Sequence, residues 1–149
     1  MEKPKVYIID DSLIFRAMLE TMIDQDAGFD ICGIAATPEQ ALAELGWVLP
    51  DIILLDLNFR GGGMSGFDFL EEIDGHWHAM TVVVISTDAH HGSEVCDRVF
   101  ERGPTVCFDK GRVIRSGREL MELLHELGDY RRIKSQNFSN AITLPTVHH

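Results

Sequence analysis

Acidic side chains stand directly after two apolar runs of this 149-residue sequence. Asp10 and Asp11 follow a run that ends at Ile9, and Asp56 follows a run that ends at Leu55. Crowded carboxylates repel one another and are costly to ionise unless a cation joins them. Oxygen ligands without a neighbouring histidine or cysteine suit a hard divalent ion. The three aspartates therefore predict a Mg²⁺ site, in which Mn²⁺ is expected to substitute.

A strand-end carboxylate beside Mg²⁺ can act as a nucleophile and form an aspartyl phosphate. Such a transfer mostly requires positioning and neutralisation of oxygen charge. Two residues that follow later apolar runs suit this chemistry: the hydroxyl of Ser86 would hydrogen-bond a phosphoryl oxygen, and the ammonium of Lys110 would supply positive charge. Each has an ordinary explanation when taken alone, as a turn residue or a solvated lysine. Their joint placement favours the chemical interpretation.

The order of apolar and amphipathic segments predicts how these residues are positioned. Apolar residues from Phe15 to Met22 recur with helical period, and similar segments lie between all the apolar runs. Near-continuously apolar strands that alternate with helices predict an α/β fold with a parallel sheet covered on both faces. The arrangement is that of a doubly wound, flavodoxin-like sandwich, whose ligand site lies at the carboxyl ends of the strands. The expected strands are Val6–Ile9, Asp30–Ile34, Ile52–Leu55, Val82–Ile85 and Thr105–Phe108.

Capping signals predict where several helices begin and end. Residues 37–40, TPEQ, combine a cap, a first-turn proline and a capping-box partner. The third helix is expected to start near Gly66, and the fifth with a capping box over residues 116–119. Gly128 predicts the end of that helix. Residues 129–149 are predicted to form a C-terminal tail that is partly helical or disordered.

Four stretches, VYIIDDS, DIILLDLN, VVVISTD and CFDK, resemble the signatures of the response-regulator receiver domain, in order and at normal separations. The resemblance covers about residues 4–128. It implies a five-stranded sheet in the order 2-1-3-4-5. It also implies that Asp56 accepts a phosphoryl group from a sensor histidine kinase, or from a phosphotransfer protein, with Mg²⁺. The chain is then expected to be a cytoplasmic signalling switch and not a turnover enzyme.

The same resemblance implies a role for each matching residue. Asp11 resembles the direct Mg²⁺ ligand, Asp10 helps through water, and the backbone carbonyl of Asn58 completes the metal site. Ser86 matches the switch hydroxyl and Lys110 the lysine of the family pattern. Phosphorylation would change the surface formed by the fourth helix, the fifth strand and the fifth helix, and so affect an unknown protein target. A homodimer through that face is a further implication.

Three positions depart from the family pattern. Cys107 stands where an aromatic residue is usual, and the neighbouring Phe108 should point to the other face of the strand. Thr87 is bulkier than usual, which predicts slow phosphorylation by small donors and slow autodephosphorylation. Gly111 replaces a common proline, so a cis peptide is unfavourable there and a looser loop is expected.

The string GGGMSG, Gly61–Gly66, is a literal dinucleotide-binding fingerprint between a strand and a helix. However, residues 57–60 intervene before the first glycine, and Asp56 would repel an incoming pyrophosphate. We interpret the string as an extended loop after the phosphoacceptor, with a helix-opening glycine at Gly66. The tip of this loop is predicted to be mobile, because glycine imposes little on the backbone.

Composition argues against several other classes of function. Thirteen basic residues against 24 acidic ones give a net charge of −11, so direct binding to nucleic acid or to an anionic membrane is not expected. No apolar run approaches the roughly 20 residues of a membrane span. The three cysteines are odd in number and lack metal-ligand spacing, which is typical of a reduced, cytosolic protein.

Three alternatives stay open at this point. A receiver-like module that binds partners without phosphate is suggested by the missing aromatic residue. A nucleotide-dependent oxidoreductase or a haloacid-type phosphatase is disfavoured, since the phosphatase would need an aspartate in place of Asn58. A zinc site at His76, His78 or the pair 90–91 lacks a spaced second pair of ligands.

The segment DDSLIFRAMLETMI most resembles chemotaxis-type regulators, including receivers fused to methylesterases.

Overall fold

A computed structural model describes residues 2–74, 80–87 and 105–147 of the chain. Five parallel strands form one sheet in the order β2-β1-β3-β4-β5, which confirms the predicted flavodoxin-like α/β fold. β1 pairs with β2 on one side and with β3 on the other, so the direction of strand addition reverses beside β1. A ligand site is expected at the carboxyl ends of the strands at such a reversal. The strands are β1 (Lys5–Ile9), β2 (Asp30–Ala35), β3 (Ile52–Asp56), β4 (Thr81–Ser86) and β5 (Thr105–Asp109).

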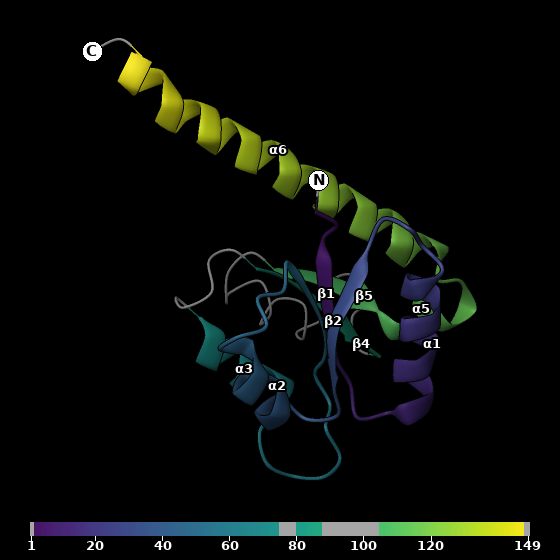
Figure 1. Cartoon of the computed structure of the whole chain (residues 1–149). Helices are drawn as coiled ribbons and strands as arrows, with labels where there is room; N and C mark the ends of the chain where they lie inside the picture. Colours follow the sequence, from purple (N-terminus) through teal and green to yellow (C-terminus); the bar gives the residue numbers. More distant parts are fainter. Residues whose placement is uncertain (1, 75–79, 88–104, 148–149) are drawn as a thin grey trace.

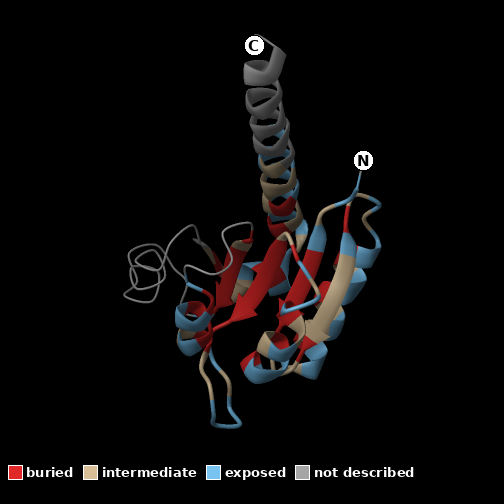
Figure 2. Ribbon diagram, turned by 60° about the vertical axis from the view of Figure 1, so that its left-hand side comes forward, coloured by how far each residue is buried: buried red, intermediate tan, exposed pale blue. Residues whose placement is uncertain are grey.

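Helices cover both faces of this sheet (Figure 1). Side chains of α2 and α3 share one buried cluster with one face of the strands, and side chains of α1, α5 and α6 share the other. Buried residues therefore run through all the central strands (Figure 2). The predicted fourth helix, around Val95–Phe100, lies outside the described residues. The described helices are α1 (Leu13–Asp24), α2 (Pro38–Leu45), α3 (Gly66–Ile73), α5 (Lys110–Arg115) and α6 (Arg118–Val147).

Side-chain caps determine where the helices next to the strand ends begin. The Ser12 hydroxyl accepts the N–H of Phe15 and thereby starts α1 directly after the aspartate pair. Thr37 caps α2 as predicted, with Pro38 at the first position of the helix. Ser65 forms a reciprocal capping box at the start of α3 that was not predicted from the sequence. These caps satisfy free N–H groups and keep each strand-to-helix connection in one conformation.

The region after β5 differs from the prediction. A looser loop and a capping box over residues 116–119 were expected, but Lys110–Arg115 form the short helix α5. Asp109 supplies its cap, because the carboxylate accepts the N–H of Gly111 at 3.1 Å. The N–H of Ser116 closes α5 by donating to the carbonyl of Arg112, and Glu119 pairs with the Arg112 guanidinium. The acidic cap therefore orders the segment that was expected to be loose.

The predicted end of the last helix at Gly128 is wrong. α6 continues through this residue as far as Val147 and projects past the sheet (Figure 1). A Cβ atom on Gly128 would lie 3.1 Å from Cγ of Pro4, so the glycine allows close packing against the N-terminal segment. Three residues later, the Arg131 guanidinium lies 3.2 Å from the Asp51 carboxylate. In the part of the chain that the structure describes, no helix is both long and apolar enough to cross a membrane.

Candidate functional site

Three aspartates meet at the carboxyl ends of β1 and β3. Asp10 follows β1, and Asp56 is the last residue of β3; their exposed fractions are 2% and 4%. Asp10, Asp11 and Asp56 each offer one oxygen, and these three oxygens lie within 4.8 Å of one another. The structure thus brings together the carboxylates that the sequence placed in one metal site. Such a set of oxygen ligands fits a hard divalent cation.

Backbone contacts hold Asp10 at the end of its strand. Its N–H donates to the carbonyl of Ala35 at 3.1 Å, which continues the pairing of β1 with β2. Its Oδ1 accepts the N–H of Ser12 at 2.8 Å. The Arg16 guanidinium donates to the Asp10 carbonyl at 2.7 Å and ties α1 to the strand end. One carboxylate oxygen, Oδ2, is left to face the site.

The loop after β3 contacts the other two aspartates. The N–H of Asn58 donates to Oδ1 of Asp56 at 3.2 Å, and the N–H of Arg60 donates to Oδ2 of Asp11 at 3.0 Å. Residues 58–60 therefore wrap around the acidic cluster. The contact of Asn58 was not anticipated, because the family resemblance implies a role for its carbonyl only. That metal-facing role of the Asn58 carbonyl stays a prediction.

Gly66 lets α3 approach the end of β3. A Cβ atom on Gly66 would lie 2.6 Å from the carbonyl oxygen of Asp56 and 2.6 Å from Cα of Leu57. Real side chains do not tolerate such contacts, so the helix-opening glycine is a steric requirement of this connection. Gly62 and Gly63, at the loop tip, have φ of 76° and 80°, the left-handed region that favours glycine. The mobility of this tip stays a prediction.

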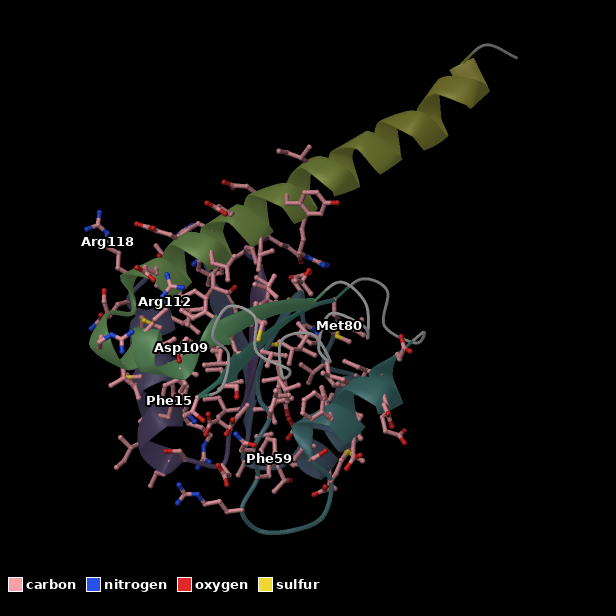
Figure 3. The ribbon with its side chains drawn as sticks, turned by 180° about the vertical axis from the view of Figure 1, so that it is seen from behind. Phe15, Phe59, Met80, Asp109, Arg112 and Arg118 are labelled. Atoms are coloured by element: carbon pink, nitrogen blue, oxygen red, sulfur yellow. The ribbon has the colours of Figure 1, made fainter. Side chains whose placement is uncertain are left out.

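Lys110 connects two of the aspartates. As the first residue of α5, it places Nζ 3.0 Å from Oδ2 of Asp10 and 3.5 Å from Oδ2 of Asp56. Its side chain is only 14% exposed. The ring of Phe15 faces the same ammonium, with Nζ 4.3 Å from the ring centroid. Figure 3 labels Phe15 and Asp109, the residue before Lys110, in this region. From the sequence, Phe15 was predicted only to lie on the apolar face of a helix, with no role in the site.

The site carries more negative than positive charge among its described side chains. Burial raises the pKa of Asp56 from 3.8 to about 6, and the neighbouring charges of Asp10 and Asp11 act in the same direction. The Lys110 ammonium and the N–H of Asn58 lower that pKa in part. Three clustered carboxylates thus have one ammonium beside them, which contacts two of the three, and a divalent cation would balance the remaining charge.

The remaining predicted positions lie around this cluster. Ser86 is 1% exposed, ends β4 and pairs in register with Asp109 of β5. Cys107 packs on the cluster formed by α2 and α3, whereas Phe108 packs on the cluster formed by α1, α5 and α6. The prediction that Phe108 points away from the face of Cys107 is therefore confirmed. Thr87 is exposed beside the site. The histidines of the zinc alternative, at 76, 78, 90 and 91, fall outside the described residues.

Sequence comparisons identify relatives for most of the chain. A family model described as the response regulator receiver domain matches residues 6–126. The chain is 34% identical over 112 residues to protein-glutamate methylesterase/protein-glutamine glutaminase 2 of Vibrio vulnificus, covering 75% of this chain and 32% of the relative. It is 31% identical over 137 residues to protein-glutamate methylesterase/protein-glutamine glutaminase 3 of Burkholderia lata, covering 91% of this chain and 36% of the relative. The chain spans about a third of the length of the curated relatives it matches.

Solved structures share the fold. The response regulator domain of Thermotoga maritima CheB superposes with a TM-score of 0.74 at 20% identity, covering 88% of this chain and 98% of that one. The chemotaxis protein CheY4 of Vibrio cholerae gives 0.70 at 24% identity, covering 85% and 99%. The predicted similarity to chemotaxis-type regulators is confirmed by these relatives. The match over residues 6–126, together with the acidic cluster at the strand ends, shows that the chain belongs to the response regulator receiver domain family of two-component signalling.

Proposed function

We propose that Asp56 accepts a phosphoryl group from a phosphohistidine of a sensor histidine kinase or phosphotransfer protein, and that this changes a protein-interaction surface. The observation that carries the proposal is the placement of the Lys110 ammonium against both Asp10 and Asp56, beside a cluster of three carboxylates. A partly buried lysine that reaches two carboxylates suits the stabilisation of a phosphoryl oxygen. The proposal places the chain in the cytoplasm.

In the proposed reaction, a carboxylate oxygen of Asp56 attacks phosphorus and forms a P–O bond while the P–N bond of the donor phosphohistidine breaks. The leaving imidazole keeps the electron pair of the broken bond and is protonated by solvent. Lys110 and the hydroxyl of Ser86 would each contact an oxygen of the transferred group. Asp10, Asp11, Asp56 and the carbonyl of Asn58 would hold Mg²⁺, or Mn²⁺ in its place, which supplies positive charge when bound.

The electrostatics of Asp56 fit the role of nucleophile. With a pKa of about 6, this carboxyl is mostly ionised at neutral pH and still more basic than an ordinary aspartate. A more basic carboxylate is the stronger nucleophile, provided that it is deprotonated. A bound cation would favour the ionised form further.

The decisive experiment is intact-mass spectrometry after incubation with phosphoramidate and Mg²⁺, and separately with a phosphohistidine-bearing kinase domain. Wild type is expected to gain one phosphoryl group and Asp56→Asn none. Asp24→Asn is a matched control, because Asp24 is exposed at the end of α1, and it should react as wild type does. Because Thr87 predicts a slow reaction with small donors, the incubation with the kinase domain is the more informative of the two. Wild type of unchanged mass in both arms would overturn the proposal and favour the phosphate-independent binding module.

The output surface belongs to the same proposal. β5 and the first turns of α6 would form it together with the fourth helix, which the structure does not describe. Cys107 in place of an aromatic residue removes the usual coupling between the switch hydroxyl and this face, so the signal would take another route. Light scattering with and without phosphodonor tests the expected homodimer. A comparison of the proteins captured by the phosphorylated chain with those captured by Asp56→Asn tests for a protein target.

A further inference from the structure

Phe15 presents a ring face to the lysine of the site. The ammonium of Lys110 lies 4.3 Å from the ring centroid, within the range in which an aromatic face attracts a cation. Both groups are shielded from water, since Phe15 is 4% exposed and the lysine side chain 14%. A cation–π contact is stronger in such a desolvated setting than at a surface.

The position of the ring is determined by α1 and the core. Ser12 accepts the N–H of Phe15 at 3.2 Å. The guanidinium of Arg16, the next residue of the helix, donates to the carbonyl of Asp10. The ring belongs to the buried cluster that also contains Ile85 and Val113. It is therefore held by elements on several sides and cannot follow the lysine if the ammonium moves.

The carboxylates alone would hold the ammonium less well at the moment of reaction. Asp56 loses part of its negative charge when its oxygen bonds to phosphorus, and a bound cation competes with Lys110 for the charge of Asp10. The lysine side chain is long and has many rotamers. The ring of Phe15, in contrast, is neither consumed nor shared during the transfer.

We propose that Phe15 is a positioning residue for phosphoryl transfer, whose ring keeps the Lys110 ammonium directed at the site while the charges of Asp10 and Asp56 change. This inference rests on the proposed function of Asp56. Replacement of the ring by an aliphatic side chain, as in Phe15→Leu, should lower the rate constant of phosphorylation at saturating Mg²⁺ roughly tenfold. Phe15→Tyr keeps the ring and should retain most of the rate.

A matched control separates positioning from loss of core packing. Phe29 is 5% exposed, belongs to the same buried cluster and precedes β2, at the other end of the sheet. Phe29→Leu should therefore lower the free energy of unfolding about as much as Phe15→Leu and leave the phosphorylation rate at the wild-type value. Equal rates for the two leucine variants would overturn the inference.

A fluorinated series supplies a readout that packing alone does not move. Incorporation of 4-fluoro-, 3,5-difluoro- and 3,4,5-trifluorophenylalanine at position 15 weakens the negative face of the ring with little change of shape. The logarithm of the rate constant should fall stepwise with each fluorine, and a flat series would contradict the inference. If wild type itself gains no phosphate, the proposed function fails. The upfield ring-current shift of the Lys110 ε-methylene protons, expected to be lost in Phe15→Leu, then tests the contact by itself.

Discussion

The strand β3 lies between two aspartates with opposite surroundings. Asp51, just before the strand, has a side chain 35% exposed and accepts from the Arg131 guanidinium at 3.2 Å and from the N–H of Lys5 at 2.8 Å. Asp56, at the other end, is 4% exposed and shares one ammonium with a second buried carboxylate. The first aspartate is paired as in an ordinary structural contact. The second is left with charge that its neighbours do not balance.

This difference distinguishes a structural edge of the sheet from the edge that holds the candidate site. At the amino edge, Asp51 joins β1, β3 and α6, and Asp26 pairs with His125 of α6 at 2.7 Å. At the carboxyl edge, burial and then the neighbouring charge of Asp10 raise the pKa of Asp56, at a cost in stability. Clustered groups with strongly shifted pKa values are typical of functional sites. Four measurements test whether the two edges differ in this way.

Removal of the positive partner should have the largest effect. Lys110→Met leaves two buried carboxylates without their cation, so the free energy of unfolding at pH 8 in EDTA is expected to fall by about 3 kcal/mol. Arg131→Met removes a partly exposed partner at the amino edge and should cost less than about 1 kcal/mol. Urea denaturation of both variants gives the comparison. Equal losses would mean that the two edges are not electrostatically different.

The pH dependence of stability isolates Asp56. Its folded-state pKa of about 6 lies above the unfolded value of 3.8, so the folded protein binds this proton more tightly. Stability relative to Asp56→Asn should therefore rise by about 2.4 kcal/mol as pH falls from 8 to 4. Urea denaturation at several pH values measures this difference. A difference that is independent of pH would contradict the raised pKa.

Mg²⁺ should stabilise the carboxyl edge selectively. A ligand that binds only the folded state adds about 2.7 kcal/mol at roughly 100 times its Kd. Thermal or urea unfolding with and without Mg²⁺ should show this gain in wild type and in Asp51→Asn. In Asp11→Asn the gain should be mostly lost, because one of the three clustered oxygens is replaced. An undiminished gain in that variant would place the ion elsewhere.

The smallest effect is expected at the contact between α6 and the α1–β2 turn. The N–H of Gly28, and next His125, lower the pKa of Asp26, the reverse of the shift at Asp56. Asp26→Asn should therefore remove stability that is present at neutral pH and is lost as pH falls through the folded-state pKa. The loss should be under about 1 kcal/mol, because the pair is partly exposed. A loss that grows toward acid pH would contradict the assignment.

Local sequence determined most of the framework of the candidate site. Apolar strands followed by Asp10, Asp56, Ser86 and Lys110 were sufficient to predict the α/β class, the edge at which these residues gather and the need for a cation. The prediction succeeded because the carboxyl ends of all strands in a parallel sheet lie at the same edge. This holds regardless of how the helices pack on the sheet. Gly66 was predicted on the same basis, as the start of a helix after a strand.

Contacts between distant segments were decided only by the tertiary structure. The approach of α1 to α5 places the ring of Phe15 on Lys110, and the approach of α6 to the amino edge pairs Arg131 with Asp51. Gly128 illustrates the reason: read locally it is a helix stop, but its missing side chain makes room for Pro4 and the helix continues. Local preferences amount to about 1 kcal/mol per residue, and packing between segments overrides them.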